Sequence, residues 1–216
     1  MLVTVVDGFA GNWAARELTV DQDGTVLTEE ISLEEAPPEV QKTVRAQVAQ
    51  GKLQSIEKNL EHADLSYDVE MTNKEGGHRS FSVAPDGKLT SVQISLQEVP
   101  APVRKTIQAH IGNGKLGDIY KLIEGNEISF DAEVDRNGKI REVVVAPDGK
   151  LESIEVGLAD VTAEAQRTIK ERIGSGKLVR IDKTFDGNQP YEVEAIKEGK
   201  PFNFRVGPKG RLLGKD

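Results

Sequence analysis

The sequence predicts an α+β fold of tandem α-β-β-β-β repeats, whose strands form a curved antiparallel sheet with the helices on one face. The first observation is a repeat: Gly-Lys-Leu occurs at 51–53, 114–116 and 176–178, at intervals of about 62 residues. The second is that each copy begins with apolar residues at helical spacing and continues with alternating apolar and polar residues. The third is that no linker rich in Gly, Ser or Pro separates the copies, which favours a shared sheet.

A helix is predicted at the start of each copy. In the first copy, Val40, Val44 and Val48 form one apolar stripe at the i, i+4, i+8 spacing. The Pro-Pro pair at 37–38 suits a first helical turn, and Gly51 suits the end of a helix. The stripe recurs in the other two copies, at Val103, Ile107 and Ile111 and at Ala165, Ile169 and Ile173.

Four antiparallel strands are predicted to follow each helix. Residues 67–71 alternate Tyr-Asp-Val-Glu-Met, which places apolar side chains on one face and acidic side chains on the other. A hairpin turn at 75–77 and the Pro-Asp-Gly turn at 85–87 separate this strand from the next two. The same order recurs in the second and third copies, so each helix can cover the apolar face of its own strands.

The repeats divide the chain into four predicted segments. Residues 1–30 form an N-terminal half repeat, a β-hairpin, because the Asp-Gly at 23–24 lies one repeat before the Asp-Gly at 86–87. Three full repeats follow at 31–93, 94–155 and 156–216. A single unit of about 62 residues buries too little surface to be stable alone, so neighbouring repeats are expected to share their core.

Composition restricts the classes of partner. The chain has 36 acidic and 28 basic residues and a formal net charge of −8, which opposes binding to nucleic acid. No run of apolar residues is long enough for membrane insertion, and residues 1–6 are too few and lack the basic leader of a signal peptide. The absence of Cys excludes thiolate chemistry, and no cofactor is expected.

Several motifs together resemble a known family. They are the segment Leu-Gln-Glu-Val-Pro-Ala-Pro-Val-Arg-Lys-Thr-Ile at 96–107 with the Gly-Lys-Leu after it, Pro-Asp-Gly-Lys-Leu at 147–151 and Tyr-Glu-Val-Glu at 191–194. These resemble PepSY-like domains, whose fold is similar to that of the β-lactamase inhibitor protein. The resemblance covers the three full copies. It implies a periplasmic or extracellular bacterial protein that binds or inhibits other proteins, and it supplies no catalytic residue.

Acidic residues recur in pairs on the predicted wet face, at Asp68 and Glu70, Asp131 and Glu133, and Glu192 and Glu194. Side chains at i and i+2 of a strand lie about 7 Å apart, a separation that fits paired catalytic carboxylates, and such acids could also bind calcium. Acids that keep an exposed antiparallel face soluble explain the same pattern without any chemistry. We therefore predict that the protein is not an enzyme and has no catalytic residues.

The expected functional site is a protein-binding face. If Ile119 points into the core, Tyr120 points outwards among the acids and suits an interface, although packing across strands is an alternative. Trp13, in the predicted loop 8–13, either anchors a contact or closes the open end of the sheet. The predicted partner-binding residues are Tyr120, Asp68, Glu70, Asp131, Glu133 and Trp13.

No metal site is expected. The Asp-Gln-Asp-Gly at 21–24 resembles the start of a calcium loop, but its Gly comes two positions early and matches the hairpin turns of the other copies. His62, His78 and His110 occupy non-equivalent positions in the repeat, which makes a shared metal site unexpected.

The sequence thus predicts a non-enzymatic protein-binding or inhibitor-like module of the bacterial envelope or exterior. The alternative is a structural or spacer repeat protein of the cell envelope. A specific protein partner would separate the two hypotheses, because a spacer needs none.

Overall fold

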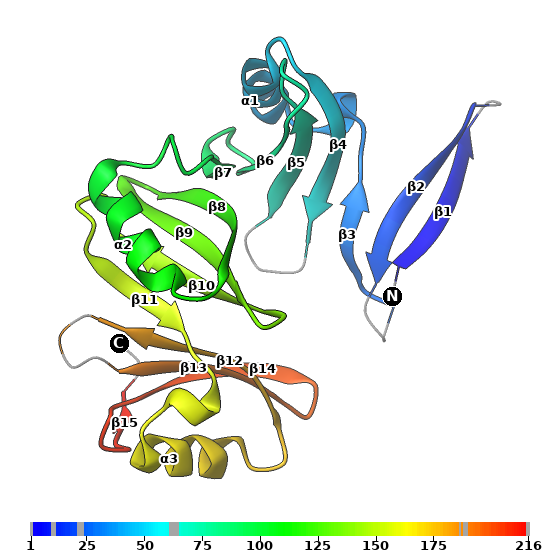
Figure 1. Ribbon diagram of the computed structural model, residues 1–216. Helices are drawn as coiled ribbons and strands as arrows, with labels where there is room; N and C mark the ends of the chain where they lie inside the picture. The colour runs from blue at the N-terminus through cyan, green and yellow to red at the C-terminus, as the bar shows by residue number, and fades with distance from the viewer. Residues whose placement is uncertain are drawn as a thin grey trace. The chain divides into compact units, whose positions relative to one another are not determined.

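The computed structural model describes the backbone of residues 2–9, 12–20, 24–60, 65–185, 187 and 190–214, with side chains in these ranges from residue 17 onwards (Figure 1). The chain forms two compact units. The first comprises Met1–Ile94 with Lys121–Glu127, and the second comprises Ser95–Tyr120 with Ile128–Asp216. Each unit contains its own cluster of buried apolar side chains.

The first unit is a meander of antiparallel strands with one α-helix. Its strands are β1 (Leu2–Phe9), β2 (Asn12–Val20), β3 (Val26–Glu30), β4 (Lys52–Asn59), β5 (Ser66–Thr72), β6 (His78–Val83) and β7 (Leu89–Gln93). They pair antiparallel in chain order. A short 3-10 helix, η1 (Leu33–Glu35), and α1 (Pro38–Val48) connect β3 to β4.

The second unit continues the same pattern with two α-helices, α2 (Ala101–Ile111) and α3 (Ala163–Ile173). Its strands are β8 (Lys115–Glu124, whose last four residues belong to the first unit), β9 (Glu127–Arg136), β10 (Lys139–Val145), β11 (Leu151–Glu155), β12 (Lys177–Thr184), β13 (Tyr191–Lys197), β14 (Lys200–Val206) and β15 (Leu212–Leu213). From β9 to β15 each strand pairs antiparallel with the next. The 3-10 helix η2 (Leu158–Asp160) and α3 connect β11 to β12.

The predicted fold class of tandem α-β-β-β-β repeats is wrong. In the part of the chain that the structure describes, fifteen antiparallel strands stand against three α-helices and two short 3-10 helices. The reason is that α1 and α3 are short and each joins two strands that pair antiparallel with each other, β3 with β4 and β11 with β12. The helical stripes are the clearest periodic signal in the sequence, but the strand ladder carries most of the backbone hydrogen bonding.

Two other expectations concern the organisation of the chain. Residues 1–30, predicted to be a half repeat, contain β1, β2 and β3. The predicted division at 31–93, 94–155 and 156–216 stays a prediction.

Among the described residues, no helix is long and apolar enough to cross a membrane.

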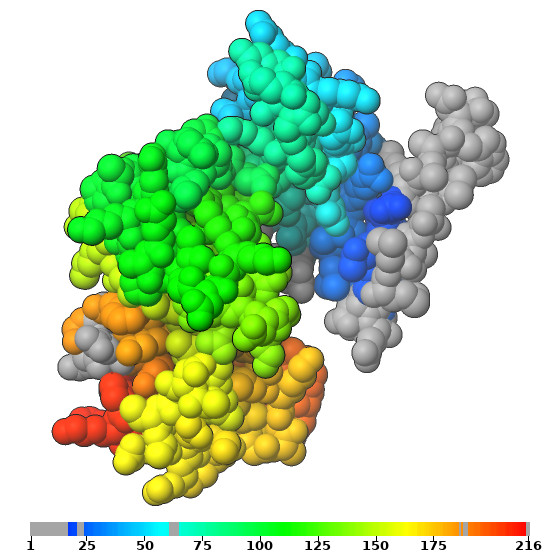
Figure 2. Space-filling model, in the orientation of Figure 1, coloured from blue at the N-terminus to red at the C-terminus, as the bar shows by residue number. Residues whose placement is uncertain are grey.

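Strand alternation places one face of each unit's sheet under a helix. In the first unit, α1 buries Val40 and Val44 against Ile56, Val69 and Phe81 of β4, β5 and β6. In the second, α3 buries Ala165, Ile169 and Ile173 against Ile181, Tyr191, Val193 and Val206. In the space-filling view the atoms of α3, in yellow, lie against those of the strands they cover, in orange (Figure 2). The alternate residues of these strands therefore form a helix-free face.

The repeated Pro-x-Gly turns are attached to the helices by one recurring contact. Gly87, Gly149 and Gly210 have φ angles of 83°, 88° and 75°, a conformation that favours Gly. Their carbonyl oxygens accept hydrogen bonds from the hydroxyl groups of Thr43, Thr106 and Thr168, at 2.6, 2.7 and 2.7 Å. A Cβ atom on Gly149 would lie 2.8 Å from Cβ of Pro102, in the first turn of α2. The recurrence of these residues thus has a structural cause.

We expect Thr106→Val to lower the free energy of unfolding by about 1 kcal/mol, because the side chain keeps its shape but loses the hydrogen bond to Gly149. Urea unfolding measures the change. Thr106→Ser, which keeps the hydroxyl group, is the matched control and should retain more of the stability. Equal losses in both variants would show that the hydrogen bond contributes nothing.

Candidate functional site

Of the two acids predicted on the helix-free face of the first unit, Asp68 bonds to neighbouring strands and Glu70 is exposed. Asp68 accepts hydrogen bonds from the Ser82 hydroxyl group, at 2.6 Å, and from the Asn59 side-chain amide, at 3.4 Å. Ser82 lies directly opposite Asp68 on β6. Glu70 is exposed, and its carboxylate lies 3.6 Å from the His78 ring. The contacts of Asp68 join β5 to β4 and β6.

The second unit carries a row of five acids across its helix-free face. Cross-strand pairs join Glu133 to Glu142, Glu155 to Asp182, and Asp182 to Glu192. The row is continuous because Val143, next to Glu142, pairs with Ile154, next to Glu155. We call Glu133, Glu142, Glu155, Asp182 and Glu192 the acidic row. Like charges directly opposite each other destabilise a sheet, so the row needs a counter-charge.

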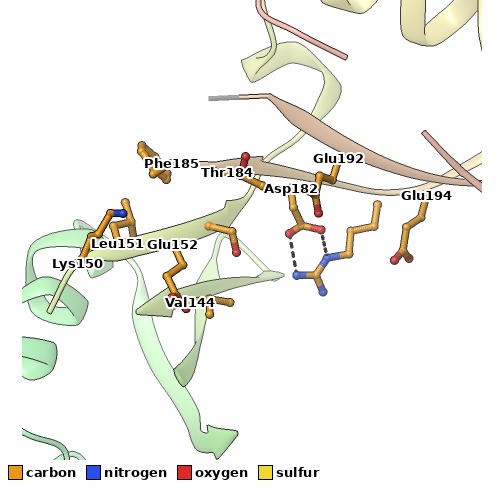
Figure 3. Close-up of a pocket in the computed structure, with 11 residues that line it drawn as sticks. Val144, Lys150, Leu151, Glu152, Asp182, Thr184, Phe185, Glu192 and Glu194 are labelled. Carbon is orange, nitrogen blue, oxygen red and sulfur yellow. Dashed lines mark hydrogen bonds and ion pairs between the residues drawn. The ribbon is translucent and has the colours of Figure 1, made fainter. Parts of the chain in front are cut away.

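Arg180 of β12 supplies this counter-charge. Its Nη1 lies 2.5 Å from Oε2 of Glu142. Its Nε and Nη2 donate to the two carboxylate oxygens of Asp182 at 2.6 and 2.8 Å, the contacts drawn as dashed lines in Figure 3. Burial by itself would lower the pKa of Arg180, but the hydrogen bonds with Asp182 and Glu142 raise it. The guanidinium is therefore a permanent cation that connects β10 with β12.

Asp131 of β9 lies beside the acidic row and is the most perturbed carboxyl group of this face. Burial raises its pKa to about 7, and the negative charges of Glu142, Glu133 and Asp182 add to the effect while Arg180 opposes it. Its Oδ1 atom is buried and has no hydrogen-bond partner among the described residues. Burial also raises the pKa of Glu155, which Arg180 again opposes.

A shallow groove of about 580 Å³ lies along this face. Asp182, Glu192 and Glu194 line one end of it (Figure 3), and Arg180 also lines the groove. Leu151 and Phe185 line the other end, where the Lys183 ammonium lies 5.2 Å from the centre of the Phe185 ring. Lys150 and Glu152 line the same end as Leu151 (Figure 3), so the groove joins an anionic end to an end with both apolar and charged side chains.

The structure places the six predicted partner-binding residues in different environments. Asp68 and Glu70 belong to the first unit, whereas Tyr120, Asp131 and Glu133 belong to the second. Because Ile119 of β8 is buried, alternation directs the half-buried Tyr120 towards the helix-free face. Trp13, predicted in a loop, pairs with Gly8 in the β1–β2 ladder, and its side chain lies outside the described residues.

The other candidates can be placed only in part. Asp21, Gln22 and Asp23 of the predicted calcium-loop resemblance, and His62, lie outside the described residues. Within the described ranges, no group of three or more His, Asp or Glu side chains has the geometry to hold a metal ion.

Sequence reasoning missed Arg180, Glu142, Glu155 and Asp182. One signal was available, because Arg180 occupies the position that Ser55 and Asp118 hold in the other copies. A basic residue at a position that is polar or acidic in the other copies indicates that nearby acids need a positive charge. The row itself could not be read from i, i+2 pairs, since its members lie on five different strands.

A relative in sequence and several solved structures resemble part of this chain. No known family model matches it. An uncharacterised protein of Clostridium beijerinckii is 31% identical over 125 residues, which cover 53% of this chain and 23% of that protein. The chain therefore spans about a quarter of the length of this relative.

Two solved structures resemble part of the fold at a TM-score of 0.41 each. One is a protein of Bacteroides eggerthii named as periplasmic, 14% identical, matched over 54% of this chain and 86% of that chain. The other is a DUF2874 family protein of Bacteroides ovatus, 13% identical, matched over 54% of this chain and 85% of that chain. The name of the first structure gives a periplasmic location for that protein, and a periplasmic or extracellular location was the prediction for this one.

Proposed function

We propose that this protein is a non-enzymatic binding module of the bacterial envelope or exterior, which holds another protein against the helix-free face of its second unit. The observation that carries the proposal is the groove beside the acidic row, which combines exposed carboxylates with apolar side chains on a surface that no helix covers. The resemblance to PepSY-like domains supports the same role, including inhibition of the bound protein.

The charge of the face selects the chemistry of the partner. The acidic row has five carboxylates, and Glu194 adds a sixth, while Arg180 and the Arg205 guanidinium beside Glu192 are the cations that pair with them. The surplus of negative charge favours a partner with Lys or Arg side chains and repels an acidic one. A basic surface loop of a protein fits the dimensions and charge of the groove.

We expect charge reversal on this face, in a variant with both Glu133→Lys and Glu194→Lys, to weaken partner binding about tenfold or more. The partner would first be captured from an envelope extract with the intact protein, and its affinity for purified variants would then be measured by calorimetry. Tyr120→Ala tests the half-buried aromatic side chain of the same face, which a partner would contact directly.

The matched control carries the same change in net charge on the opposite side, Glu164→Lys with Glu171→Lys, two exposed positions of α3. It should retain the affinity of the unmodified protein. Equal weakening in both double variants would mean that only net charge matters, and unchanged affinity in the face variant would move the binding site elsewhere.

A spacer of the cell envelope is the second candidate function. It is favoured by the finding that the recurring Thr and Gly residues hold turns to helices and thus serve the fold. A spacer would show no saturable partner, and charge reversal on either face would leave its behaviour in the envelope unchanged.

A further inference from the structure

Asp131 lacks the two side-chain hydrogen-bond donors of its counterpart in the first unit, because Val144 and Leu122 stand at the repeat positions of Ser82 and Asn59. Asp68 corresponds to Asp131 in the repeat, and the residue directly opposite Asp68 is Ser82, whose hydroxyl group donates to its carboxylate at 2.6 Å. The residue directly opposite Asp131 is Val144, which has no donor in its side chain. The buried Oδ1 atom without a partner follows from this exchange.

The charged groups around Asp131 also differ from those of the first unit. Ser80 and Gln93, which form a neutral hydrogen bond in the first unit, are replaced by Glu142 and Glu155. The charged groups that act on Asp131 are Glu133 on its own strand, Glu142 on β10, and Arg180 and Asp182 on β12. Glu155 on β11 lies on the same face, opposite Asp182. Strand β8 contributes Asp118 and Tyr120 to the same face, since Ile119 between them is buried.

We propose that Asp131 is a proton-controlled switch in the sheet of the second unit, in which one proton decides how Arg180 is shared between β9, β10 and β12. With the proton bound, Asp131 is neutral, and Arg180 is divided between Glu142 and Asp182 as the structure shows. When the proton leaves, a third carboxylate competes for the same guanidinium and repels Glu142. The helix-free face then gains one negative charge.

The direction of the response follows from the burial of the carboxyl group. A carboxyl that is desolvated and surrounded by other acids keeps its proton to a higher pH than an exposed one, and for Asp131 the pKa is about 7. The switch therefore operates close to neutral pH. It does not depend on the proposed partner, because all its components belong to this chain.

The test is a titration of the full-length, isotope-labelled protein by NMR from about pH 4 to about pH 9. We expect the side-chain carboxyl carbon of Asp131 to titrate with a midpoint near 7 and the Nε–H signal of Arg180 to move with the same midpoint. In Asp131→Asn the movement of the Arg180 signal should disappear from this pH range.

A variant that adds a hydrogen-bond donor opposite Asp131 tests whether the missing donor causes its raised pKa. Val144→Ser places a hydroxyl group opposite Asp131, as Ser82 lies opposite Asp68, and we expect it to lower the midpoint by about one pH unit, a tenfold change in proton affinity. Val144→Ala removes the same methyl groups without adding a donor and should leave the midpoint near its original value. Ser82→Val, in the first unit, should not move the Asp131 midpoint.

Three outcomes would overturn the proposal. The first is a midpoint for Asp131 below about 5 in the unmodified protein, which is the range of an exposed carboxyl. The second is an Arg180 signal that does not follow Asp131, which would make the titration a local event. The third is an equal shift in Val144→Ser and Val144→Ala, which would show that the hydroxyl group is irrelevant.

Discussion

Replacing Gly149 by Ala should lower the free energy of unfolding by about 2 to 5 kcal/mol. A φ of 88° is unfavourable for a residue with a Cβ atom, at about 1 to 2 kcal/mol. The added Cβ would also lie 2.8 to 2.9 Å from Cβ, C and O of Pro102, and such overpacking typically costs about 1 to 3 kcal/mol. Urea unfolding of the full chain measures the change.

Gly138→Ala is the matched control for this prediction. Gly138 has a φ of 76°, but a Cβ atom there would meet nothing within 4 Å. It should therefore lose only the conformational part, about 1 to 2 kcal/mol. If both variants lose the same amount, the close approach between the turn and α2 contributes nothing to the stability of the second unit.

Replacing Arg180 by Met should lower the free energy of unfolding by about 2 to 3 kcal/mol at pH 8. Removing one partner of a buried ion pair leaves the other charge uncompensated, which costs about 3 to 5 kcal/mol when burial is complete. The Arg180 side chain is 26% exposed, so its burial is incomplete and we expect a smaller loss of stability than for a fully buried pair. The loss should appear as a lower midpoint of urea unfolding.

The loss of stability in Arg180→Met should increase as the pH rises. A carboxyl whose pKa is raised in the folded state binds its proton more tightly there than in the unfolded state, so its stabilising effect is lost as the pH rises from the ordinary value near 3.8 to about 7. Without Arg180, which holds the pKa values of Asp131 and Glu155 down, this dependence should become steeper. The penalty should therefore be smaller at pH 5 than at pH 8.

The control for Arg180→Met is Lys88→Met, which removes an exposed ion pair with Asp86. It should have no measurable effect on stability. A pH-independent penalty in Arg180→Met would contradict the electrostatic explanation and would indicate that the side chain stabilises the sheet through packing alone.

The sequence was a good guide to local structure. The stripe of Val40, Val44 and Val48 lies on α1 as the helical spacing predicted, and the first two of these residues are fully buried. The alternation at 67–71 correctly separated buried Tyr67 and Val69 from the acids between them. The fold class was wrong because local periodicity says which elements form, whereas the pairing of strands with one another determines the class.

The candidate site was predicted only in part. Asp131 and Glu133 were identified from their position on a wet strand face. The structure places both on β9 of the second unit, which pairs with β10. Glu142, Glu155 and Arg180 were missed, because each is unremarkable within its own strand. Their importance arises only when β9 to β12 lie side by side in one register.

The sequence by itself determined the repeat, the helices, the turns and the acidic character of the exposed strand face, because these depend on spacings within about one turn or one hairpin. The tertiary structure decided which charges meet. A register shift between Leu178 and Arg180 changes the alternation along β12, so that Arg180 and Asp182 share the helix-free face while Val179 is exposed. Cross-strand register joins residues about 40 positions apart, such as Glu142 and Arg180, and no spacing within a single strand encodes that contact.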